Sequence, residues 1–185
     1  MLELDPTDSA FLWIIFSIAI AGLVNATVLS YQTVRYPTGT KDMNKISKAI
    51  RIGANSYLRK QLMSIAVVVV ILPVILYLLP AFQPLGYPSI ALGRMLAFLM
   101  GAGFSATVGF IGMNIATRAN VRVAAAAGRS FGEALKIAYR GGTVTGMLTD
   151  GLGLLGGTLV FLFYRDFAYE VLLGFGFGGT LIALF

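Results

Sequence analysis

The sequence GAGFSATVGFIGMNIATRANVRVAAAA occupies residues 101–127 and decides the fold class. Its first half is apolar and rich in small residues, and Gly101, Ser105 and Gly109 recur every four positions, so they share one helical face. In a membrane, where packing drives helix association, such a face lets two helix backbones approach closely. The second half becomes basic and polar where an apolar span would leave the bilayer. We predict a closely packed membrane helix with a basic, polar end; a generic packing helix with a positive flank is the simpler alternative.

The composition also indicates a membrane protein. Of 185 residues, 57% are hydrophobic and 12% are charged, whereas roughly a quarter of residues are charged in soluble domains. We predict an all-α polytopic membrane helix bundle with about five transmembrane helices, in a single membrane domain over residues 1–185. The expected spans are 9–34, 61–79, 90–117, 141–164 and 170–185.

The last span is short. The residues after Glu170 rise about 22 Å in a helix, less than a hydrocarbon core of about 30 Å. Starting this helix at Phe167 would narrow the gap but bury Glu170. We therefore expect the last span to be incomplete and the natural protein to continue; a short interfacial tail is the alternative.

The basic residues predict the topology. Segments 35–60 and 118–140 carry seven and five Lys or Arg residues, twelve of the 14 in the chain. The positive-inside rule places both segments in the cytoplasm and the N-terminus outside, with helices extending into the cytoplasm. The net charge of +6 is therefore a topology signal, and nucleic-acid binding is not expected. On the outer side, Arg94 is expected to extend its long side chain to the interface.

Residues 41–60 are predicted to form an amphipathic basic helix, capped by Thr40 or Asp42. We expect its apolar side to dock on the bundle and its basic side to be solvated; a membrane-surface role and attraction of an anionic substrate are the alternatives. The apolar positions, spaced by three and four, are Met43, Ile46, Ile50, Gly53 and Tyr57.

Cysteine and histidine are absent, which excludes thiolate metal sites and Cys or His nucleophiles. A carboxylate inside a span is a candidate functional group, and Asp150 lies in the fourth span on the face of Gly142 and Gly146. We expect Asp150 to point into protein. It is either protonated or hydrogen-bonded across helices, or it serves ion transfer or a dimer contact.

Four stretches, in order, resemble one family, the membrane-bound, ion-translocating inorganic pyrophosphatases. They are IGANSYLRKQ (52–61), the stretch at 101–127, GGTVTGMLTDGLGLLG (141–156) and GFGFGGTLIALF (174–185). The resemblance implies hydrolysis of diphosphate on the cytoplasmic side, outward pumping of protons or sodium ions, use of Mg2+ and in some members of K+ or Na+, and a homodimer. It also implies an integral protein of a prokaryotic cell membrane. Its first four helices would belong to an outer ring, and the fifth to the inner ring that carries the active site.

The sequence departs from this family in one respect. The Gly-rich, Lys- and Asp-bearing segment that binds Mg-diphosphate in the family does not occur in residues 1–185. The resemblance therefore assigns no catalytic residue and no metal ligand here. We expect this chain alone to be inactive, with its partners being the lipid bilayer, the remainder of the polypeptide and a second copy.

The resemblance also suggests functional positions. Thr180 takes the place of a small hydroxyl residue, usually Ser, near the ion gate; the alternative is that it only bonds a carbonyl of its own helix. A second set is predicted to brace the cytoplasmic vestibule, or simply to anchor helix ends: Arg118, Asn120, Arg122, Tyr57 and Arg59.

Two other classes of protein remain open. One is a self-contained small membrane subunit that packs against a partner and has no chemistry of its own. The other is a piece of a secondary transporter, which predicts an inverted repeat, and no internal repeat is visible in the sequence.

Overall fold

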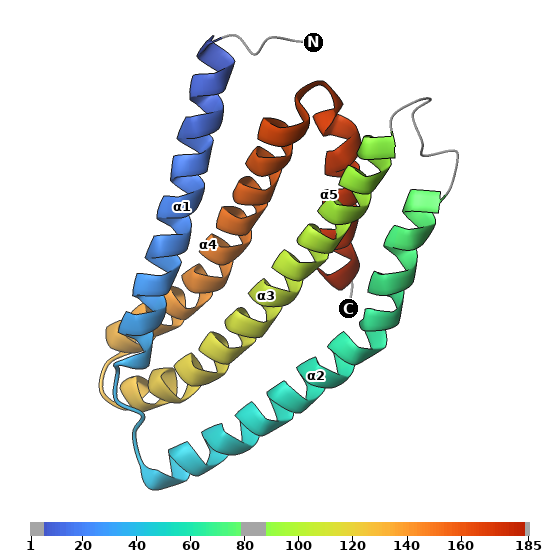
Figure 1. Cartoon of the computed structure of the whole chain (residues 1–185). Helices are drawn as coiled ribbons and strands as arrows, with labels where there is room; N and C mark the ends of the chain where they lie inside the picture. The colour runs from blue at the N-terminus through green and yellow to red at the C-terminus, as the bar shows by residue number, and fades with distance from the viewer. Residues whose placement is uncertain (1–5, 79–87, 184–185) are drawn as a thin grey trace. The chain divides into compact units, whose positions relative to one another are not determined.

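The protein is described by a computed structural model that covers residues 6–78 and 88–183. Over these two ranges it consists of helices and no strands (Figure 1). Four helices are long and apolar enough to cross a membrane. The all-α membrane fold is confirmed, with a count close to the predicted five. The elements are α1 (Pro6–Val34), α2 (Lys41–Leu78), α3 (Pro88–Ala127), α4 (Phe131–Tyr164), the 3-10 turn η2 (Arg165–Phe167) and α5 (Ala168–Ala183).

The basic helix and the second span form one element, α2, which continues through Pro73 to Leu78. Its cap is Thr40, whose Oγ1 accepts a hydrogen bond from the backbone N–H of Met43 at 3.3 Å. This satisfies one of the free N–H groups of the first turn. The predicted end of the second span at 79 and of the fifth at 184–185 lie outside the described residues.

The third and fourth helices are longer than a bilayer core requires. The 40 residues of α3 correspond to about 60 Å, twice the hydrocarbon thickness of about 30 Å. A short turn at residues 128–130 joins α3 to α4, and Ser130 Oγ accepts a hydrogen bond from the N–H of Glu133 at 3.4 Å. The helices therefore have the length to extend well beyond the membrane, as predicted.

The fifth helix starts earlier than predicted. A reversal after α4 is made by η2, where Arg165 adopts a φ of 42°, and α5 begins at Ala168. The helix therefore begins two residues before the expected start of the last span at 170. Glu170 consequently lies within the first turn of α5.

The chain divides into two compact units, and α1 to α4 each contribute residues to both. Among the described residues, unit 1 comprises 6–20, 61–78, 88–107 and 151–183, and unit 2 comprises 21–60 and 108–150. The core of unit 1 includes the buried side chains of Ile90, Ala97, Val160, Ala168 and Val171. Unit 2 has one core around Ala26, Ile115, Val144 and Leu148 and another around Ala126, Ala134 and Ile137.

Candidate functional site

A basic groove with a volume of about 590 Å³ opens in unit 2. It lies among the end of α1, the first part of α2 and the second half of α3, and its cationic lining residues are Lys48, Arg51, Arg118 and Arg122. Asn44, Ser47 and Asn55 add amide and hydroxyl groups, and no Asp or Glu lines the groove within the described ranges. We call this feature the basic groove.

Arg122 is held in place by backbone carbonyls. Its Nε and Nη2 donate to the carbonyl oxygen of Val34 at 3.1 and 2.6 Å, and its Nη1 donates to the carbonyl oxygen of Arg118 at 2.6 Å. Val34 is the last residue of α1, so the guanidinium satisfies a helix-end carbonyl and complements the negative end of the dipole. Arg122 therefore fastens the end of α1 to α3.

The positive charges of the groove act on one another. Arg122 lies beyond the predicted end of the third span at 117, and partial burial lowers the pKa of its guanidinium. The neighbouring charges of Arg118 and Arg51 lower that pKa further. The charges of Arg118 and Arg51 thus repel that of Arg122, and no carboxylate among the described residues lines the groove.

Two of these guanidiniums have unused donors. The Nε atoms of Arg51 and Arg118 are buried, and neither has a hydrogen-bond acceptor in the part of the chain that the structure describes. An unsatisfied buried donor is costly, and charged donors cost more than neutral ones. These two atoms are therefore buried donors that the described residues leave unsatisfied.

The predicted orientation of the basic helix is wrong. Ile46, Ile50 and Tyr57, expected to dock, are 62%, 48% and 60% exposed, whereas its polar residues line the groove against α3. The signal was present in the sequence, because Asn44, Lys48, Arg51 and Asn55 recur at spacings of four, three and four and therefore share one helical face. Basic character led us to expect solvation of that face.

Only part of the predicted vestibule set comes together. Arg118 and Arg122 line the groove, but Tyr57, Arg59 and Asn120 are exposed and lie outside its lining. The functional residues that the sequence reasoning missed are Lys48 and Arg51, which it treated only as solvated charge.

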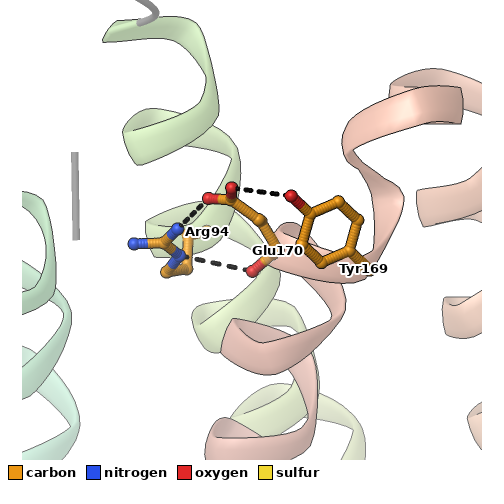
Figure 2. Close-up of polar contacts among 3 residues, drawn as sticks. All are labelled: Arg94, Tyr169 and Glu170. Atoms are coloured by element: carbon orange, nitrogen blue, oxygen red, sulfur yellow. Dashed lines mark hydrogen bonds and ion pairs between the residues drawn. The ribbon is translucent and has the colours of Figure 1, made fainter. Parts of the chain in front are cut away.

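A buried ion pair joins α3 to α5 in unit 1 (Figure 2). Arg94 Nη2 lies 2.5 Å from Glu170 Oε2, and Arg94 Nε donates to the backbone carbonyl oxygen of Glu170 at 3.2 Å. Their side chains are 6% and 19% exposed, and Tyr169 Oη donates to the other carboxylate oxygen at 3.2 Å. The expectation that Arg94 reaches the interface is wrong, because its side chain is buried against Glu170. The attraction between the two opposite charges offsets the free energy that each loses by desolvation.

Glycines allow the backbones of α3 and α5 to touch next to this pair. A Cβ on Gly101 would collide with the backbone oxygen of Phe175, and one on Gly178 would collide with the backbone of Phe98 and lie 2.9 Å from the N atom of Ala102. This close approach is the kind of packing that stabilises helix pairs in lipid.

The other small residues predicted for packing differ from Gly101. Ser105 is half-buried, and Gly109, Gly142 and Gly146 are exposed, with no described atom within 4 Å of a Cβ built on any of these three glycines. Within the described chain, the small-residue face of α3 therefore contacts α5 at Gly101, and it has no close neighbour at Gly109.

Asp150 and Thr180, the candidate ion-pathway residues, are both exposed. Thr180 Oγ1 donates to the carbonyl oxygens of Gly176 and Phe177 at 2.9 and 3.2 Å, which is the bond to its own helix considered above. Asp150 does not point into the described protein, because its neighbours on the same face are open glycines. The two residues lie in different units.

The described residues do not make a metal centre. Across residues 6–78 and 88–183, no three Asp, Glu, His or Cys residues come together in a way that could hold an ion. A magnesium site of several carboxylates does not fit the side chains present here.

Comparison with known proteins identifies the family of the chain. Residues 20–185 match the family model described as inorganic H+ pyrophosphatase. The chain is 44% identical to a K(+)-insensitive pyrophosphate-energized proton pump of Chloroflexus aurantiacus, covering 100% of this chain and 26% of the relative, and 45% identical to one of Streptomyces coelicolor, covering 98% and 24%. It is 39% identical to a K(+)-stimulated pyrophosphate-energized sodium pump of Thermotoga maritima, covering 84% and 20%. The chain spans between 20% and 26% of the length of these relatives, and it belongs to the inorganic H+ pyrophosphatase family.

Proposed function

We propose that this chain is the N-terminal part of a membrane pump that couples hydrolysis of inorganic diphosphate to outward translocation of protons, or of sodium ions. The family match over residues 20–185 carries this proposal. The relatives include pumps named for protons and for sodium. Family membership therefore does not identify the pumped ion, which is determined by the experiment below.

Within such a pump, the described residues would serve as structure. Four long apolar helices would form part of the wall in lipid, and α5 would be fastened to α3 by the Arg94–Glu170 pair and the glycine contact. The proposal places hydrolysis, and the Mg2+ ligands it requires, in other parts of the complete protein. The 185-residue chain alone would be inactive.

The arrangement in the membrane is part of the same proposal. The basic segments, including the basic groove, would face the cytoplasm of a prokaryotic cell with the N-terminus outside, because twelve of the 14 Lys and Arg residues lie in them. The working form would be a homodimer that binds Mg2+ and, depending on its subtype, responds to K+ or Na+.

The test uses inverted membrane vesicles that contain the complete protein. Diphosphate is added, and released phosphate is measured together with acidification of the lumen, with and without Na+, K+ and a protonophore. A proton pump should acidify the lumen in proportion to hydrolysis, and the protonophore should abolish the gradient while hydrolysis continues. A sodium pump should instead accumulate labelled Na+.

A folded complete protein that hydrolyses no diphosphate and moves neither ion would overturn the proposal and favour a structural subunit. Expression of residues 1–185 alone is the matched control. Diphosphate hydrolysis by that short chain would contradict the placement of the catalytic groups elsewhere.

A further inference from the structure

The geometry of the basic groove points to a binding site for a phosphate group, carried either by a lipid headgroup or by free phosphate. The groove lies within unit 2, and its cationic side chains come from two helices: Lys48 and Arg51 from α2, and Arg118 and Arg122 from α3. The inference does not depend on diphosphate hydrolysis.

The hydrogen-bonding pattern separates structural from available donors. Arg122 uses Nε, Nη1 and Nη2 on backbone carbonyls, whereas the buried Nε atoms of Arg51 and Arg118 have no acceptor among the described residues. Arg122 therefore holds α1 against α3, and the other two guanidiniums have donors that lack an acceptor. Because both Nε atoms are buried, a bound anion would satisfy them only after the arginine side chains change rotamer.

The charge of the groove selects the sign of the ligand. Four cations line it, and its remaining polar lining residues, including Asn44 and Asn55, carry no negative charge. Without a ligand these cations repel one another, so an anion would relieve the repulsion and supply acceptors at the same time. Cations are excluded by the same argument.

Among anions, phosphate fits best. Guanidinium groups pair with phosphate through paired N–H donors, and several arginines around one site are typical of phosphate recognition. A volume of about 590 Å³ exceeds that of one phosphate and leaves room for a headgroup or for water. A groove between membrane helices near the end of a span is also a known setting for acidic phospholipid headgroups.

The experiment compares three forms of the complete protein. They are wild type, the groove variant Arg51→Gln/Arg118→Gln, and a control variant, Lys41→Gln/Lys45→Gln. The control removes the same charge from exposed positions of α2 that do not line the groove. Any phosphate bound at a catalytic site would affect all three forms equally.

Two arms distinguish the source of the phosphate. In the first, inorganic phosphate is titrated into protein in phosphatidylcholine nanodiscs, and the rise in melting temperature gives the affinity. In the second, nanodiscs with and without phosphatidic acid are compared, and bound lipid is counted by native mass spectrometry. The groove variant should bind the probe about tenfold or more weakly in at least one arm, because charge-assisted hydrogen bonds are lost, while the control should match wild type.

The arm that responds identifies free phosphate or lipid as the source. If the groove variant matches wild type in both arms, the inference is wrong. It is also wrong if wild type responds to neither probe, which would mean that another part of the protein supplies the missing acceptors. If the double variant does not fold, Arg51→Gln alone replaces it, since the Nε of Arg51 has no acceptor to lose.

Discussion

Substitution of Gly101 by Ala tests the helix contact that fastens α5 to α3. A Cβ at this position would lie 3.0 Å from the N atom of Gly179 and closer still to the carbonyl oxygen of Phe175. Both are backbone atoms, which cannot rotate away as a flexible side chain can. The two helices would have to separate, and overpacking of this kind costs about 1–3 kcal/mol.

Gly103 provides the matched control, because it lies on the same helix and no atom of the described residues lies within 4 Å of its Cβ position. Gly103→Ala should be neutral or stabilise by up to about 1 kcal/mol, since Ala is the better helix former. The two variants should therefore differ by about 1–4 kcal/mol. The loss of monodisperse complete protein on heating in detergent measures this difference. Equal stability of the two variants would refute the contact.

Three further substitutions test other parts of the structure by the same heating assay and by pumping. Glu170→Gln should destabilise the protein by about 3–5 kcal/mol, because it leaves Arg94 with a buried, uncompensated charge. The control Glu133→Gln, at an exposed ion pair, should cost less than about 1 kcal/mol. Equal effects of the two substitutions would show that the ion pair of Arg94 is solvated. Thr40→Ala should cost about 1 kcal/mol through loss of the α2 cap, and an unchanged melting temperature would contradict the cap. Asp150→Asn in the complete protein should leave hydrolysis and pumping unchanged if this carboxylate is structural, and a selective loss of pumping would assign it to ion transfer.

The helices themselves were predictable because their signals are local. Long uncharged runs and the cap at Thr40 each act within a few positions of the chain. The helix α2 is continuous for the same reason, since nothing between residues 60 and 61 breaks a helix.

Partners across helices were less predictable. Arg94 and Glu170 are 76 positions apart. Taken alone, Arg94 is interpreted as a side chain that reaches the interface, and Glu170 as a charge that is too costly to bury. Both side chains can be buried only because they are close together. The attraction between their charges offsets the free energy that each charge loses by desolvation. The start of α5 was misplaced for this reason: the prediction put the helix start at a charge that is in fact paired within the fold.

The basic helix shows the same effect on a larger scale. Its apolar and polar residues both repeat at helical spacing, so periodicity identifies two faces but does not say which one meets α3. In water the apolar face would be buried by the hydrophobic effect. That effect acts only where a neighbour is present, and the described residues offer little cover to Ile46 and Ile50. The polar face, with Arg51 among its residues, instead lines the basic groove against α3.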